Sequence, residues 1–227
     1  MDGMEGPLGG GRRKSNYHHG SLRAALLEAA EEELAERGIE GFTLRGVAKR
    51  AGVSHAAPAH HFRDTSDMLT ALATIGMERF CRAMEKTQAE PHASPRDRYI
   101  ASGVTYVEFA LANPTLFHLM FGSRRPDFES PGFVQHSSTA FQNLVDGIAA
   151  IRGGAPLEVR AGRMDIAAAW ALVHGIATLM IARRLKFLAG DLAENRTETI
   201  REMVSRIALL ADENGGTAPR DATTSAD

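Results

Sequence analysis

Apolar residues recur along most of this chain with the period of an α-helix, at spacings of three and four residues. Glycine and proline interrupt the pattern, and no run of alternating apolar and polar residues bounded by hairpin turns occurs. The pattern therefore predicts an all-α fold of about nine helices. Besides two short helices within 43–62, the expected helices cover residues 21–37, 65–88, 96–112, 114–121, 133–152, 157–188 and 195–212.

The stretch from Thr43 to Phe62, TLRGVAKRAGVSHAAPAHHF, predicts two short helices joined by a tight turn. Thr43 is placed to cap the first helix, and Gly52 is placed to end it, because glycine adopts a left-handed conformation at little cost. Ser54 is placed to cap a second helix that runs to about His61. This arrangement is a helix-turn-helix, whose second helix can enter a DNA major groove.

Basic side chains are concentrated in the same stretch. Between Thr43 and Arg63 there is no acid, and the cations are Arg45, Lys49, Arg50 and Arg63. The 227-residue chain has a formal net charge of −2, so affinity for the phosphates of a duplex must come from this local patch. The alternative is a solvated helical hairpin in an enzyme or an adaptor.

The two ends of the chain are polar and rich in small residues. Residues 1–16 are rich in glycine and contain Arg12, Arg13 and Lys14. We expect a flexible basic arm that either stays in solvent or lies on DNA phosphates or in a minor groove. Residues 213–227 are expected to be a disordered tail.

The stretch from about Gly20 to Arg79 resembles the DNA-binding domain of the TetR family of bacterial transcriptional regulators. The resemblance rests on LLEAA (26–30), ERG (36–38), FTLRGVAKRAGVS (42–54) and HF (61–62), which occur in an order and spacing rather specific to that family. It implies an all-helical, dimeric repressor with a DNA-binding domain at 17–79 and an effector-binding and dimerisation domain at 80–212. The helix AWALVHGIATL (169–179) is similar to one branch, whose C-terminal domain carries a Trp/His/Gly signature.

This resemblance implies that the second helix of the motif reads bases, while the first helix and the arm hold phosphates. The residues expected at the DNA are Thr43, Arg45, Lys49, Ser54, His55, Ala56, Ala57, Ala59, His60 and His61. The expected partner is a double-stranded, palindromic operator.

The sequence departs from the usual pattern of the family at several residues. Ala59 stands where a phosphate-binding tyrosine is usual, and Thr65 and Ser66 stand where a lysine is usual. We therefore expect weaker DNA binding, or compensation by the basic arm. Glu33 stands where leucine is usual, and with its acidic neighbours on the first helix it is expected to face away from DNA.

The sequence offers little support for metal binding or catalysis. Adjacent histidines such as His60 and His61 point about 100° apart on a helix, so no metal site or cofactor is expected. The sequence contains no GxSxG, P-loop or GxGxxG motif, so an enzyme is not expected. The single cysteine, Cys81, suits a reducing, cytoplasmic location, and no membrane partner is expected.

The C-terminal half is rich in aromatic and methionine side chains, which are either core residues or the walls of a ligand cavity. On the resemblance, the residues expected to bind a ligand are Phe109, Phe117, Met120, Phe121, Trp170 and His174. Trp170 and His174 are four residues apart and share one helix face, so they suit an apolar ligand with one acceptor. The alternative is a core tryptophan beside a histidine that bonds a backbone carbonyl.

The last two expected helices have more apolar faces than one core can use. Pairing with a second copy around a two-fold axis would bury the excess. The residues expected at this interface are Ile176, Met180, Ile200, Met203, Val204 and Ile207. The sequence thus predicts a homodimeric repressor released from its operator by a small apolar or aromatic molecule of unknown identity. The rivals are a regulator without an effector and a helical enzyme or carrier.

Overall fold

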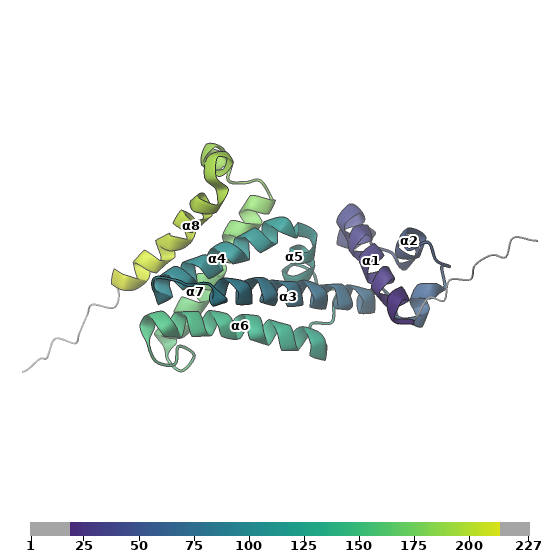
Figure 1. The fold of residues 1–227 in the computed structure, drawn as a ribbon, viewed down its shortest axis with the longest axis horizontal. Helices are drawn as coiled ribbons and strands as arrows, with labels where there is room; N and C mark the ends of the chain where they lie inside the picture. The colour runs from purple at the N-terminus through teal and green to yellow at the C-terminus, as the bar shows by residue number, and fades with distance from the viewer. Residues whose placement is uncertain (1–18, 214–227) are drawn as a thin grey trace, which may run out of the picture.

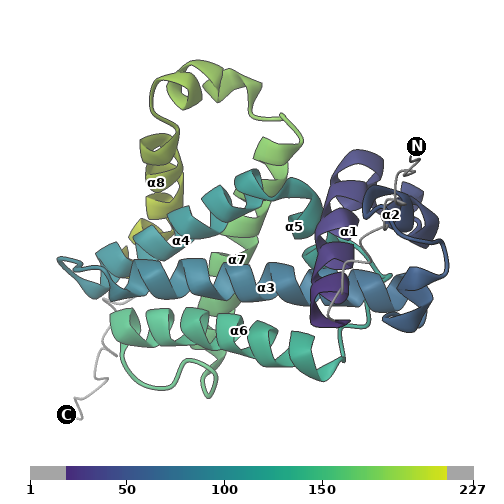
Figure 2. The same cartoon turned by 45° about the vertical axis from the view of Figure 1, so that its right-hand side comes forward.

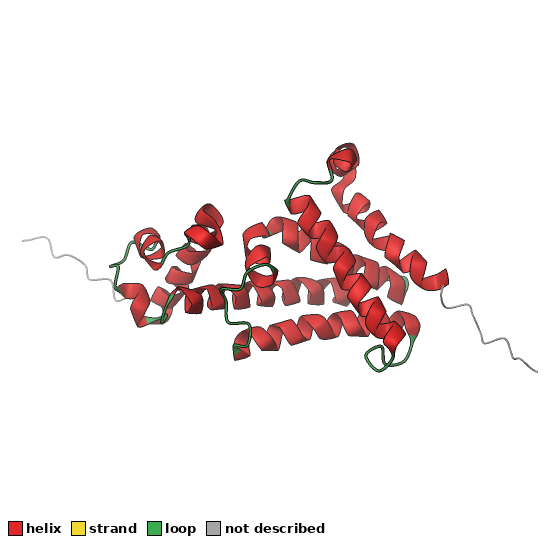
Figure 3. Cartoon of the chain, turned by 180° about the vertical axis from the view of Figure 1, so that it is seen from behind, coloured by secondary structure: helices red, strands yellow, loops and turns green. Residues whose placement is uncertain are grey.

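The computed structural model describes residues 19–213, and its regular structure is entirely helical (Figure 3). The predicted all-α fold is confirmed: residues 19–213 contain eight α-helices and two short 3₁₀ helices, without a strand. The elements are α1 (His19–Gly41), α2 (Leu44–Arg50), η1 (Ala57–His60), α3 (Thr65–Ala89), α4 (Pro95–Ala112), α5 (Pro114–Phe121), α6 (Pro131–Arg152), α7 (Arg160–Ile181), η2 (Lys186–Leu188) and α8 (Ala189–Glu213). The expected arm and tail lie outside the described residues, apart from Glu213.

The first three elements form a small unit at one end of the molecule (Figure 1). Helix α1 packs against α2 and against α3, and their shared core includes the buried side chains of Leu26, Leu34, Val47 and Phe62. The helix assigned to α1 extends beyond the predicted end because a further turn follows Gly38. Gly38 itself has φ of 67°, so the helix is broken where the sequence predicts a stop.

Helix α3 runs from this unit into the C-terminal bundle (Figures 1 and 2). Asp64 caps its start, because its carboxylate accepts the backbone N–H of Asp67 at 2.8 Å. Buried side chains follow along its length, from Met68 near the start to Phe80 and Met84 near the end. The expected domain boundary between residues 79 and 80 therefore falls inside one continuous helix.

The C-terminal bundle is built around α4, which packs against α3, α6, α7 and α8. Helix α7 ends earlier than predicted, because Arg183 takes a left-handed conformation with φ of 52°. The backbone N–H of Arg184 then bonds the carbonyl of Leu179 at 2.8 Å and closes the helix end. Helix α8 is broken at Asn195, whose side chain accepts the N–H of Glu198 at 3.2 Å and restarts the helix at the predicted position.

The loop between α5 and α6 touches the N-terminal unit and the start of α3. The Arg125 guanidinium donates to the backbone carbonyl of Ile39 at 2.6 Å, and the Arg125 carbonyl accepts the hydroxyl of Ser66 at 2.6 Å. The backbone N–H of Asp127 donates to the Thr70 hydroxyl at 2.8 Å. The two halves are therefore joined by this loop as well as by α3.

Among the described residues, one helix is long and apolar enough to cross a membrane by length and composition alone. It is α7, with a mean hydropathy of 1.6, and 22% of the apolar window is buried. One such helix is a weak indication of a membrane span. Its buried residues, such as Ile166, Val173 and Ile176, belong to the cores of the bundle, so α7 is a packed helix with one open face.

Candidate nucleic-acid interface and ligand cavity

Helix α2 turns one side to the core and the other to solvent. Val47 and Ala48 are buried, while Arg45 and Lys49 are exposed. Thr43 caps the helix as predicted, since its hydroxyl accepts the backbone N–H of Gly46 at 3.0 Å. The element thus holds two exposed cations on a short, well-capped helix.

The second helix of the motif is shorter than predicted and of a different type. Only Ala57–His60 is helical, as a single 3₁₀ turn. Ser54 does not cap it with its side chain; instead its backbone carbonyl accepts the N–H of Ala57 at 3.0 Å. Pro58 is buried and has no N–H, so it cannot form the α-helical bond to the carbonyl of Ser54. The predicted capped α-helix from His55 to His61 is therefore wrong.

The outer surface of this turn consists of small residues and histidines. Each residue predicted to contact DNA is at least partly exposed on the N-terminal unit. The side chains on the turn that can donate a hydrogen bond to a base edge belong to Ser54, His55, His60 and His61. Alanines 56, 57 and 59 offer only apolar contact.

Arg50 differs from the other cations of the motif because α1 holds it. Its guanidinium donates to the Glu33 carboxylate at 2.6 Å and also bonds Glu36. Glu33 is buried, not exposed as predicted, and a Cβ added at Gly46 would overlap its carboxylate. The hydrogen bond from Arg50 lowers the pKa of Glu36. Arg50 is therefore engaged by acids and, contrary to the sequence-based interpretation, is not part of an all-basic DNA surface.

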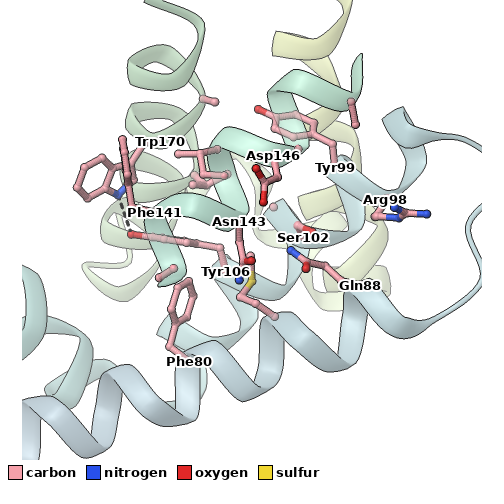
Figure 4. A pocket seen from close by; sticks show the side chains of 18 of the residues that line it. Phe80, Gln88, Arg98, Tyr99, Ser102, Tyr106, Phe141, Asn143, Asp146 and Trp170 are labelled. Atoms are coloured by element: carbon pink, nitrogen blue, oxygen red, sulfur yellow. Dashed lines mark hydrogen bonds between the residues drawn. The ribbon is translucent and has the colours of Figure 1, made fainter. Parts of the chain in front are cut away.

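A cavity of about 230 Å³ lies in the C-terminal bundle between α3, α4, α6 and α7 (Figure 4). Aromatic side chains gather at one end: Phe80, Tyr106, Phe141 and Trp170. Phe121 also lines the cavity, with its ring centroid 6.2 Å from that of Tyr106. Polar side chains gather toward the other end: Gln88, Arg98, Tyr99, Ser102, Asn143 and Asp146. The cavity can therefore hold an apolar group and a polar group at the same time.

The residues predicted to bind a ligand divide into three groups. Phe121 and Trp170 line the cavity. Phe109, Phe117 and Met120 are buried in the core and do not belong to the lining. His174 is also outside the lining, where its ring packs against Phe117 and Phe121 at centroid distances of 5.2 and 5.6 Å.

Trp170 and His174 meet at the hydroxyl of Tyr106. The Trp170 indole N–H donates to this oxygen at 3.3 Å, and the oxygen lies 3.0 Å from Nδ1 of His174. The indole can only donate, so the Tyr106 hydroxyl accepts from Trp170 and uses its remaining capacity for the hydrogen bond with Nδ1 of His174. Burial lowers the pKa of His174 and raises that of Tyr106, so both are neutral at neutral pH.

Sequence reasoning missed the wall that α4 contributes. Tyr99, Ser102, Gly103 and Tyr106 line the cavity from this helix. Their spacing of three, four and seven residues puts them on one face, and two tyrosines on such a face were the available signal. Burial raises the pKa of Tyr99 to about 12. Asn143, which lines the cavity from α6, carries no comparable sequence signal.

The residues predicted for the dimer interface are mostly occupied within one chain. Ile176, Ile200 and Val204 are buried in its own core. Met180 and Met203 are partly buried against the same core. The side chain of Ile207 lies outside the described part of the chain.

Cysteine and metal chemistry add little to the site. The Cys81 thiol is buried and donates to the carbonyl of His136 at 3.2 Å, and burial raises its pKa. Among the described residues, no three His, Cys, Asp or Glu side chains gather where they could hold a metal ion.

A helix-turn-helix unit joined by one long helix to a bundle with an internal cavity defines a class of DNA-binding transcriptional regulators. Comparison with known families names the class more closely. Residues 26–72 match the family described as bacterial regulatory proteins, tetR family, and residues 99–206 match the tetracyclin repressor-like C-terminal domain. The chain belongs to the TetR family of transcriptional regulators.

Solved structures with the same fold cover most of the chain. A protein of unknown function from Rhodococcus sp. RHA1 is 34% identical, with a TM-score of 0.64 over 88% of this chain and 96% of that one. The TetR family transcriptional regulator PfmR from Thermus thermophilus is 19% identical, with a TM-score of 0.57 over 80% and 96%. The fatty acid degradation regulator FadR from Bacillus halodurans is 14% identical, with a TM-score of 0.59 over 80% and 97%.

Proposed function

We propose that this protein is a homodimeric repressor that leaves a palindromic operator when a small, mainly apolar molecule occupies the cavity. The observation that carries the proposal is the course of α3. This helix begins beside the helix-turn-helix unit, and its far half contributes Met77, Phe80 and Met84 to the cavity wall. The same helix thus packs against the DNA-binding unit at one end and forms part of the cavity wall further along. The existence of the cavity favours this function over a regulator without an effector.

The proposed DNA surface consists of the exposed side of α2 and the turn around η1. Phosphates would be held by Arg45 and Lys49, with the Thr43 end of α2 beside them. Because the turn offers few base donors, most of the affinity should be electrostatic. With about 4–6 phosphates contacted per dimer, log K against log salt should slope by roughly −4 to −5.

The experiment is a mobility-shift assay with the DNA upstream of the protein's own gene, over a series of salt concentrations. Lys49→Ala removes one expected phosphate contact per protomer, so the salt slope should become less steep by about 2 per dimer. Lys86→Ala is the matched control, because Lys86 is also exposed but lies at the far end of α3. An unchanged slope for Lys49→Ala, or the same change for both variants, would exclude this DNA surface.

The proposed dimer contact uses the open face of α7. Met164, Ala168, Ala171 and Leu179 are exposed and recur at helical spacing, and Gly175 of the same face has no neighbouring atom within 4 Å of its Cβ position. Small residues allow two helices to approach closely, and a second copy would cover an apolar face of the length of α7. The interface would thus centre on α7 rather than on the buried residues of α8.

Light scattering tests this contact. Ala171→Arg places a charge in the middle of the open face, so the variant should be monomeric at micromolar concentration and should lose operator binding. Ala35→Arg introduces the same side chain on the exposed side of α1 and should leave the dimer intact. A wild-type monomer, or a dimeric Ala171→Arg variant, would remove α7 from the interface.

A further inference from the structure

The two ends of the cavity differ enough to indicate the chemistry of its occupant, an inference that rests on the proposed ligand-regulated function. At one end, rings of Phe80, Tyr106, Phe141 and Trp170 face the same space (Figure 4). The volume of about 230 Å³ exceeds the ~150 Å³ that suffices for benzene. The whole cavity therefore has room for one aromatic ring, or aliphatic bulk of similar size, and the aromatic side chains place that group at this end.

At the other end, one polar atom is left without a partner. Nδ2 of Asn143 is buried, and no hydrogen-bond acceptor lies within reach among the described residues. The side chain extends from α6 into the cavity between Tyr106 and Gln88 (Figure 4). An amide N–H is a donor only, and a buried donor without a partner is costly. A ligand oxygen at this place would remove the cost.

The charges around the cavity argue against an ionised ligand. Among the described residues of the lining, Arg98 and Asp146 are the charged ones, and both are exposed. They have opposite signs and lie toward the same end, so they do not favour an anion or a cation (Figure 4). The polar groups deeper in the lining, Gln88, Ser102 and Asn143, are neutral. An ionised group would lose its hydration there without a fixed counter-charge.

We propose that the cavity binds a small neutral molecule with one ring, or similar aliphatic bulk, and one carbonyl-type oxygen. The ring packs among the aromatic side chains, and the oxygen accepts a hydrogen bond from Nδ2 of Asn143. Selectivity for this class comes from the Asn143 amide, because it is the group of the lining whose buried donor has no partner among the described residues.

Three probes of similar size separate the contributions of the ring, the carbonyl and the charge to binding. Butyrophenone has a ring and a carbonyl, butylbenzene lacks the carbonyl, and 4-phenylbutyrate has a charged carboxylate. Binding to the full-length protein can be followed by the fluorescence of Trp170, the chain's single tryptophan, and by thermal shift. Satisfying a buried donor should make the ketone bind about 5- to 100-fold tighter than the hydrocarbon. The carboxylate should bind more weakly than the ketone.

Asn143→Leu should abolish the preference for the ketone. Asn143→Asp has nearly the same shape and no donor when ionised, so it should do the same at a pH where its carboxylate is ionised. Gln135→Leu is the matched control, because it removes an amide from an exposed position on α6 and should retain the preference. Equal binding of ketone and hydrocarbon by the wild type, a preference that survives in Asn143→Leu, or no binding of any probe would overturn the assignment.

Measuring operator binding in the presence of the same probes tests the proposed function independently of the ligand class. If butyrophenone binds through Asn143 but leaves operator affinity unchanged, the ligand class stands and ligand-controlled release is refuted. If butylbenzene releases the operator as well as the ketone does, release stands and the assigned role of Asn143 is refuted.

Discussion

Replacing Gly46 by alanine should destabilise this protein, although alanine is the better helix former. Gly46 lies in the first turn of α2, and the Glu33 carboxylate occupies the space where a side chain would begin. Glu33 is buried and bonded to Arg50 at 2.6 Å, so it is not free to swing aside as an exposed side chain would be. Alanine at this position must therefore displace Glu33 from Arg50.

Two opposing contributions set the size of the effect. Glycine to alanine within a helix gains about 0.5–1 kcal/mol. A hydrogen bond to a charged group contributes about 1.5–3 kcal/mol, and Arg50 keeps its second partner, Glu36. The net loss for Gly46→Ala should therefore be about 1–2 kcal/mol. In a Glu33→Ala background the space is open, so Gly46→Ala should stabilise by about 0.5–1 kcal/mol, a coupling of about 1.5–3 kcal/mol.

Urea unfolding followed by circular dichroism, on the wild type, both single variants and the double variant, measures this coupling. Gly190→Ala is the control, because Gly190 lies in the first turn of α8 and a Cβ there meets no atom within 4 Å. It should stabilise the protein in either background. If Gly46→Ala instead stabilises the wild type as Gly190→Ala does, the Glu33 carboxylate does not occupy that space.

Three other variants test separate features. Because burial lowers the pKa of His174, its neutral form favours the fold, and stability should fall as pH drops below about 6.5; His174→Asn keeps an acceptor for Tyr106 and should weaken this pH dependence in thermal unfolding. Arg125→Met removes the bond to the Ile39 carbonyl, so ligand should bind as before but weaken operator binding by less than in the wild type, where about 5- to 150-fold is expected; an equal factor would exclude this contact from the coupling. Arg183→Gly relieves a left-handed arginine and should stabilise by about 1 kcal/mol in urea unfolding; a loss would indicate that the Arg183 side chain contributes more than the backbone costs.

Helix positions were predictable wherever the chain carries its own stop and start signals. The Asn113-Pro114 pair separates α4 from α5 at the predicted residues, and Asp64 and Ser94 cap α3 and α4 where breaks were expected. These signals are local, so no tertiary information is needed. The prediction of a second α-helix in the motif was wrong for a local reason too. Ser54 was expected to cap the helix with its side chain and does not, and Pro58 lacks the N–H of an α-helical bond.

The site was less predictable because it depends on which helices meet. Trp170 and Phe121 could be placed at a cavity from sequence, but Phe109, Phe117 and Met120 belong to the core behind it. In the sequence, an aromatic residue on a buried helix face has the same pattern whether it lines a cavity or packs in the core. Only the packing of the other helices decides which of the two it does. Glu33 shows the same limit, since its burial depends on Arg50 and on the missing side chain of Gly46.

Trp170 and His174 both form a hydrogen bond with the hydroxyl of Tyr106, so this one group links the two residues. Trp170 forms part of the cavity wall, and the Tyr106 hydroxyl that it bonds also fixes His174. His174 in turn packs against Phe117 and Phe121 of α5, the helix that contacts α1 and leads into the loop that holds Arg125. A ligand that moves the Trp170 ring therefore acts on a chain of packed and hydrogen-bonded groups that ends at the DNA-binding unit. The Tyr106 hydroxyl also faces the cavity, so a ligand that hydrogen-bonds it would compete with Trp170 and His174 for the same group.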